Sequence, residues 1–154
     1  MLQRKYDVFR YWFWLEYDRY SYEFITDKWS TGQKSEEEFK KYFDTNANNL
    51  HPIEGIWNIS SSNKIVYRIA IVRYQPDTAY DYDYVGVLLM SSAGKEEPGL
   101  VKVEFRTLSQ GGIMKAIWHY QDDTVGIKEF IQLNKDVIKD TGSDLVLSKT
   151  YPKT

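Results

Sequence analysis

The chain has 154 residues, of which 42% are hydrophobic and 27% charged, as expected for one globular domain. Its formal net charge of −2, with acids and bases well mixed, argues against a general attraction to nucleic acid or anionic membranes. The absence of cysteine excludes disulfides, cysteine-ligated zinc sites and thiol catalysis. Aromatic residues reach 16%, and the many Tyr and Trp suit half-buried strands and binding interfaces.

The first predicted element is a helix with two apolar stripes, between residues 6 and 24. One stripe contains Tyr6, Phe9, Phe13, Tyr17, Tyr20 and Phe24, and the other contains Val8, Tyr11, Leu15 and Tyr22. The simpler interpretation is a helix that packs on the main domain and meets a second helix. The alternative is a surface for a second copy or a protein partner within residues 1–30, anchored by Trp12, Trp14 and Tyr22. Because the segment is so aromatic, a strand also stays open.

The second predicted helix lies in "KSEEEFKKYFDTNANN", residues 34–49. Ser35 is placed to cap it, and Glu38 follows three residues later, which is the spacing of a capping box. The acidic run at residues 36–38 suits the positive end of the helix dipole. Its short buried face is formed by Phe39, Tyr42 and Phe43. The acidic run therefore has a structural explanation.

After Pro52 the pattern changes to alternation of apolar and polar residues, broken by turn residues. The predicted strands cover residues 53–60, 64–74, 80–91, 99–108, 112–121, 125–132, 135–139 and 145–150. Short connections without intervening helices favour sequential antiparallel strands. About eight such strands predict an up-and-down sheet that closes into a barrel and so hides its edges. The predicted fold class is α+β, with an N-terminal helical segment (residues 1–50) packed on an antiparallel β-barrel domain (residues 51–154).

The first predicted barrel strand carries Gly55-Ile56-Trp57. With a helical lead-in and meandering strands, this Gly-x-Trp motif resembles the lipocalin-like (calycin) barrels, over about residues 52–152. The resemblance implies a small apolar ligand, with Trp57 closing the base of the barrel and Gly55 allowing close backbone approach. It also implies a later basic residue that packs across the Trp, for which Lys149 is the candidate by position. The segments "PIEGIW", "YRIAIV" and "VGVLL" further resemble barrel domains of uncharacterised bacterial proteins, a likeness that implies no activity.

Two functional hypotheses follow. The first is a non-enzymatic module that binds a small, mainly apolar ligand inside the barrel, lined by Trp57, Tyr67, Tyr84, Phe105 and Trp118. Arg68 is a sixth candidate: its face is otherwise apolar, so it either anchors an acidic group of the ligand or pairs with Glu104. The second hypothesis is a protein-interaction or accessory domain with a solid barrel, whose partner meets the aromatic N-terminal segment.

Glu54 depends on the register of the first strand. Alternation places it opposite Trp57, so that an inward Trp57 predicts an outward Glu54. A bulge would instead bring Glu54 into the barrel, where it would need a basic partner from Arg68, Arg73 or Arg106.

Catalysis and metal binding are disfavoured. The chain has no Gly-x-Ser-x-Gly elbow, and its two histidines, His51 and His119, lack metal-ligand spacing. Asp81 and Asp83 share one side of a strand and suit calcium or acid–base chemistry, but tyrosines on the opposite face favour a solvated acidic face. We therefore expect no cofactor, and an enzyme is the least favoured class.

No apolar run in the sequence approaches the roughly 20 residues that span a membrane. The aromatic start of the chain lacks the apolar core of a signal peptide, so a cytoplasmic location is expected if the chain is full length.

Overall fold

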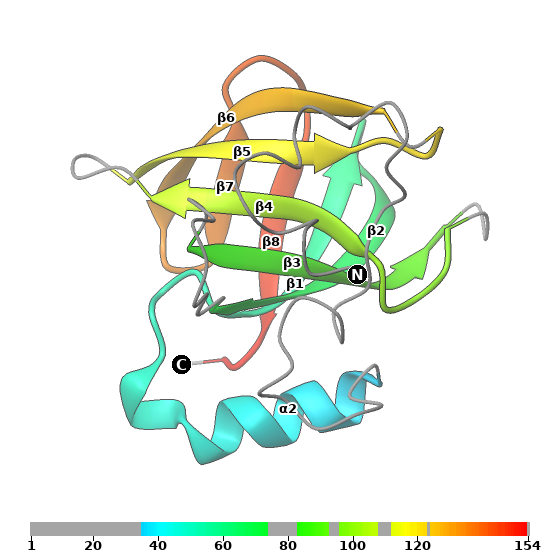
Figure 1. The fold of residues 1–154 in the computed structure, drawn as a ribbon. Coiled ribbons are helices and arrows are strands. Elements are labelled where there is room, and N and C mark those ends of the chain that lie inside the picture. Colours follow the sequence, from blue (N-terminus) through cyan, green and yellow to red (C-terminus); the bar gives the residue numbers. More distant parts are fainter. Residues whose placement is uncertain (1–34, 74–82, 93–95, 108–111, 123, 154) are drawn as a thin grey trace, which may run out of the picture.

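The computed structural model describes residues 35–73, 83–92, 96–107, 112–122 and 124–153. In these residues an α-helix and a short 3-10 helix precede eight antiparallel strands, which close into a barrel in sequence order (Figure 1). The predicted fold class is confirmed. The helix expected between residues 6 and 24, with its candidate anchors Trp12, Trp14 and Tyr22, lies outside the described residues.

The strands begin and end close to the predicted boundaries, because turn residues interrupt the alternation at nearly every connection. They are β1 (Gly55–Ser61), β2 (Lys64–Arg73), β3 (Tyr84–Ser91), β4 (Val101–Thr107), β5 (Ile113–His119), β6 (Val125–Asn134), β7 (Val137–Asp140) and β8 (Val146–Tyr151). The barrel closes where β1 pairs with β8, with Trp57 opposite Lys149. Closure leaves no free edge among these strands.

The helix α2 (Glu36–Thr45) begins after the predicted N-cap Ser35 and leads into the 3-10 helix η3 (Ala47–Asn49). The Glu38 amide donates to Ser35 Oγ at 3.2 Å, and that hydroxyl donates back to the Glu38 carboxylate at 3.0 Å. Phe39 and Phe43 are fully buried against apolar side chains on the outside of the barrel. These barrel residues are Ile56, Ala70, Val72, Val85, Val87 and Val101.

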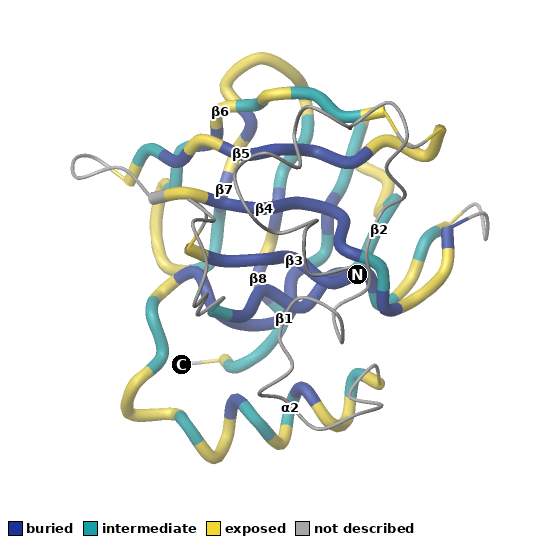
Figure 2. The backbone as a smooth tube through the Cα atoms, viewed as in Figure 1, coloured by how far each residue is buried: buried dark blue, intermediate teal, exposed yellow. Residues whose placement is uncertain are grey.

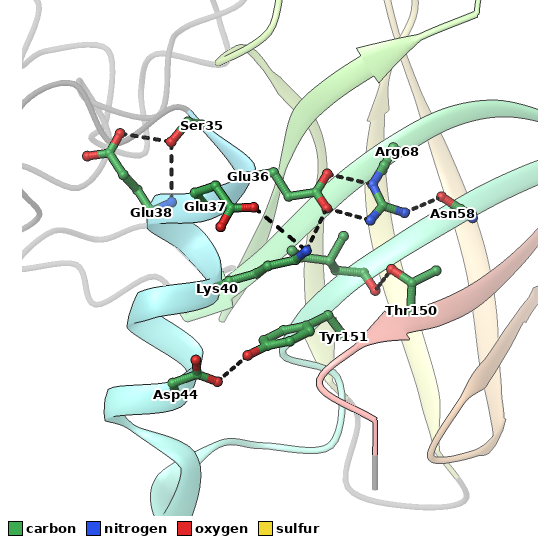
Figure 3. A network of polar contacts seen from close by, with 11 residues as sticks. Ser35, Glu36, Glu37, Glu38, Lys40, Asp44, Asn58, Arg68, Thr150 and Tyr151 are labelled. Atoms are coloured by element: carbon green, nitrogen blue, oxygen red, sulfur yellow. Dashed lines mark hydrogen bonds and ion pairs between the residues drawn. The ribbon is translucent and has the colours of Figure 1, made fainter.

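Polar contacts attach α2 to the barrel wall (Figure 3). The guanidinium of Arg68 on β2 donates to both carboxylate oxygens of Glu36, at 2.7 and 2.6 Å, and to Asn58 Oδ1 at 2.8 Å. At the other end of the helix, the Tyr151 hydroxyl donates to the Asp44 carboxylate. The ammonium of Lys40, in the middle of the helix, lies 5.3 Å from the Tyr151 ring centroid. The helix is thus held by a buried apolar face with an ion pair at one end.

The barrel interior is filled by inward-facing side chains of the strands. Buried residues gather in the barrel strands, whereas most residues of α2 are exposed or half-buried (Figure 2). We call the end at which β1 begins the base, and the opposite end, which includes the turns at residues 62–63 and 141–145, the rim. The interior cluster contains Ile53, Trp57, Ile59, Ile69, Ile71, Tyr84, Leu88, Val103, Phe105, Met114, Ala116, Trp118, Phe130, Ile138 and Leu147. Val66, Tyr67 and Leu145, which lie towards the rim, are only partly buried against this cluster.

Candidate functional site

Five of the six predicted ligand-site residues come together inside the barrel. Trp57, Tyr84, Phe105 and Trp118 belong to the interior cluster, and Tyr67 packs against it. The Tyr67 and Trp118 rings meet edge to face with centroids 6.2 Å apart. Sequence reasoning missed Phe130, whose ring lies 5.6 Å from that of Phe105 and 6.2 Å from that of Trp118.

Arg68 does not join this group. It lies on the outer side of β2 and binds Glu36 of α2, so the expected alternative of a pair with Glu104 is wrong. Glu104 instead lies 2.5 Å from Nε2 of His119, and both side chains are buried on the outer face of β4 and β5. His119 therefore has a structural partner on the neighbouring strand.

The base of the barrel is closed around Trp57. Its indole Nε1 donates to the Ile53 carbonyl oxygen at 2.8 Å, which ties the turn at residues 51–54 across the barrel end. The Lys149 ammonium lies 5.1 Å from the Trp57 ring centroid and donates to the Pro52 carbonyl oxygen at 2.6 Å. The position suggested for Lys149 by the Gly-x-Trp motif is therefore correct.

Two further features of the base follow from this close packing. Burial lowers the pKa of Lys149, although the negative charges of Asp136 and Glu54 oppose the shift. Gly55 has a φ of +150°, and a Cβ there would lie 2.4 Å from the Tyr151 carbonyl oxygen. Only glycine fits at this position, since backbone atoms cannot retreat as a flexible side chain can.

Glu54 is buried although Trp57 points inward, and its basic partner is Arg73, one of the three arginines considered from the sequence. Its carboxylate accepts from the His51 amide at 2.9 Å and from the Arg73 amide and guanidinium, each at 3.2 Å. His51 Nδ1 in turn accepts from the Ile53 amide at 3.2 Å, and burial lowers the pKa of His51. This network fixes the turn that covers the base, which is why Glu54 leaves the solvent without entering the barrel.

A second ammonium lies at the rim. Lys102 is the extra residue of a bulge in β4, because Gly86 pairs with Val103 while the next residue, Val87, pairs with Val101. The Lys102 ammonium lies 4.1 Å from the Tyr67 ring centroid and 5.2 Å from that of Trp118. It also donates to both oxygens of Glu96, at 3.1 and 3.2 Å, and the two side chains are only 1% and 4% exposed.

A third ammonium, that of Lys128, lies 5.7 Å from the same Trp118 ring centroid and 3.1 Å from Asp140 Oδ2. Asp140 also accepts from Ser143 Oγ at 2.6 Å and from the Gly142 amide at 2.9 Å. Burial works to raise the pKa of Asp140, but these hydrogen bonds and the Lys128 charge bring it below the ordinary value. The rim is thus an aromatic layer with two ion pairs.

The ion pairs of the rim were not predicted. Lys128 and Asp140 look like ordinary polar residues of alternating strands, and Lys102 points into the barrel only because of the bulge. The one signal in the sequence is the lysine in "LVKVEF", which lies among apolar residues. The side of the sheet to which this lysine points depends on a register shift that alternation does not reveal.

The described residues offer no metal centre, since no group of three or more His, Asp or Glu in them is arranged to hold an ion. Asp83 is exposed beside the buried Tyr84, as the alternation predicted, while Asp81 lies outside the described residues. No helix within the described part of the chain is long and apolar enough to cross a membrane.

Comparison of the chain with protein-family models, with curated proteins and with solved structures finds no match. The function therefore has to be argued from the geometry of the barrel. What that geometry offers is an aromatic interior with a sealed base and a rim that combines aromatic faces with paired charges.

Proposed function

We propose that the protein is a non-enzymatic binding module, and that the rim half of its barrel takes a small, mainly apolar ligand. The observation that carries the proposal is the contact between Tyr67 and Trp118, with ring centroids 6.2 Å apart, in the part of the interior cluster where Val66 and Leu145 are only partly buried. Aromatic walls with a few convergent polar groups are typical of small-molecule sites. The base is sealed by Trp57 and Lys149, so the ligand enters from the rim.

The lipocalin-like resemblance supports the same proposal. Its Gly-x-Trp motif and its basic residue on the last strand have counterparts that meet at the base, with the Lys149 ammonium 5.1 Å from the Trp57 ring centroid. A barrel of eight strands has an interior just wide enough to be filled by side chains or to hold one small ligand. Here the ligand must displace the partly buried side chain of Leu145 to reach Tyr67 and Trp118, which restricts it to a small molecule.

Native mass spectrometry of the purified protein tests the proposal first. A small molecule that stays with the folded chain and is lost on unfolding is the expected result. The site is then located by titration with the neutral probe N-phenyl-1-naphthylamine, whose affinity should fall about tenfold or more in Tyr67→Ala. Tyr151→Phe, an aromatic change on the outer face beside α2, serves as the matched control and should bind like the wild type. If the wild type neither carries a molecule nor binds the probe, the proposal is wrong.

The second candidate is an interaction domain with a solid barrel. It is favoured by the dense packing of the interior below the rim, where Trp57, Phe105 and Phe130 are all 0% exposed. This candidate assigns binding to the N-terminal aromatic residues. Replacing Trp12 and Trp14 by alanine in the full chain should then abolish self-association in sedimentation velocity, whereas Tyr67→Ala should leave it unchanged.

A further inference from the structure

We infer that the ligand of the rim carries a carboxylate that binds Lys102. The Glu96 carboxylate occupies the position of this group when no ligand is bound. The inference rests on the proposed binding function and adds the chemical class of the ligand. It also assigns a competitor to the site, one that belongs to the chain itself.

The position of Lys102 supports the inference. The bulge in β4 turns this side chain to the inner side of the wall, where its ammonium faces the rings of Tyr67 and Trp118 at 4.1 and 5.2 Å. Bulges recur where a strand must re-aim one side chain, often beside a functional site. A buried ammonium is costly unless it is paired, so this position demands a carboxylate from some source.

The source of that carboxylate differs between the two rim pairs. Asp140 belongs to the wall: it ends β7 and also accepts hydrogen bonds from Gly142 and Ser143 of the following turn. Glu96 belongs to no strand, because it lies in the connection between β3 and β4. Both of its oxygens reach the Lys102 ammonium, at 3.1 and 3.2 Å, in the way that a bound carboxylic acid would.

Exchange of one carboxylate for another is chemically balanced. When a ligand carboxylate replaces Glu96, Lys102 keeps a counter-charge, and the hydration that Glu96 regains offsets the hydration that the ligand carboxylate loses. The apolar body of the ligand then lies against Tyr67 and Trp118, the aromatic walls that already face the ammonium. A neutral ligand gains no ion pair and leaves Glu96 in place. The class that fits is therefore a small aromatic or aliphatic carboxylic acid.

Isothermal titration calorimetry with 1-naphthaleneacetic acid and its neutral amide tests the inference on the full chain. The wild type should bind the acid about tenfold or more tightly than the amide. Glu96→Gln should tighten binding of the acid about tenfold without changing the amide, because the competing charge is gone. Lys102→Met should abolish the preference for the acid, and Glu97→Gln, an exposed neighbour, should behave like the wild type.

The outcomes separate the two claims. Equal affinities for acid and amide in the wild type overturn the inference while leaving a binding barrel in place. This comparison needs no variant, so it decides the matter even if Glu96→Gln fails to fold. An unchanged ratio in a folded Glu96→Gln also overturns the role of Glu96. If neither compound binds the wild type, the proposed function itself fails.

Discussion

The base and the rim of the barrel use the same contact, a lysine ammonium facing an indole ring, with different partners. At the base Lys149 faces Trp57 and donates to a backbone carbonyl, that of Pro52. At the rim Lys102 faces Trp118 and donates to a side-chain carboxylate, that of Glu96.

The difference lies in whether the partner can leave. The Pro52 carbonyl is part of the turn that closes the barrel, so the contact at the base persists as long as the turn is folded. A side-chain carboxylate can be exchanged for another one without unfolding the chain. The base is therefore expected to determine stability and the rim to determine binding, and four sets of measurements test this division.

Truncating the central aromatic residue at each end should give the largest difference. We expect Trp57→Ala to lower the free energy of unfolding by about 3–5 kcal/mol, because a fully buried indole leaves a cavity. Tyr67→Ala, at the partly buried rim, should cost only about 1–2 kcal/mol. Urea denaturation measures both, and equal losses would contradict the division between base and rim.

Adding a methyl group to a glycine at each end should give the next largest difference. Gly55→Ala forces a Cβ to within 2.4 Å of the Tyr151 carbonyl oxygen at a φ of +150°. We expect a loss of about 2–3 kcal/mol in the free energy of unfolding. At Gly142, near the rim, the nearest atom to an added Cβ is Asp140 Oδ1 at 3.8 Å, so Gly142→Ala should be close to neutral. A harmless Gly55→Ala would show that β1 and β8 separate easily at the base.

Removing the ammonium at the base should have a moderate effect. Lys149→Met keeps the apolar stem but loses the bond to Pro52, and we expect a cost of about 1–2 kcal/mol at pH 7. Since burial lowers the pKa of Lys149, the folded state disfavours its charged form. Wild-type stability should therefore rise, relative to Lys149→Met, as pH increases from the lowered pKa towards the ordinary value of 10.5. Chemical denaturation across this range checks the sign, with the exposed Lys153→Met as control.

The acid dependence of the rim should be the smallest effect. The pKa of Asp140 is lowered in the folded state, so its contribution is present above the unfolded value and is lost as pH falls through the folded one. We expect Asp140→Asn to cost about 1 kcal/mol at pH 7, a difference that disappears between about pH 5 and pH 2. Urea denaturation at a series of pH values measures it. A difference that persists at the lowest pH would show that Asp140 acts through packing and not through its charge.

The order of the strands was predictable because most of them alternate and the connections between them carry turn residues. The strands predicted at 64–74 and 125–132, for example, are β2 (Lys64–Arg73) and β6 (Val125–Asn134). The capping box of α2 was predictable for the same reason, since its determinants lie three residues apart. The pairing of Lys149 with Trp57 joins distant residues, and it was found only through the Gly-x-Trp resemblance.

What could not be predicted depends on contacts between distant segments. Glu104 was the expected partner of Arg68, and only the docking of α2 selects Glu36 instead. Glu54 is buried because the turn at residues 51–54 covers the base of the barrel. This turn precedes β1, so the alternation of strand residues does not predict where its side chains lie. Lys102 points into the barrel because β4 contains one extra residue at the bulge. A single bulge reverses the side of the sheet that alternation predicts for every residue beyond it.

The seam between β1 and β8 has a consequence for the order of folding. Every other strand pairing joins neighbours in the sequence, whereas this one joins the first barrel strand to the last. Contacts between distant residues require a large loss of chain entropy before they form, and they slow folding. We therefore expect the hairpins to assemble first and the seam to close last. Because Trp57 and Lys149 face each other across it, closure of the barrel and sealing of its base are expected to be one kinetic event.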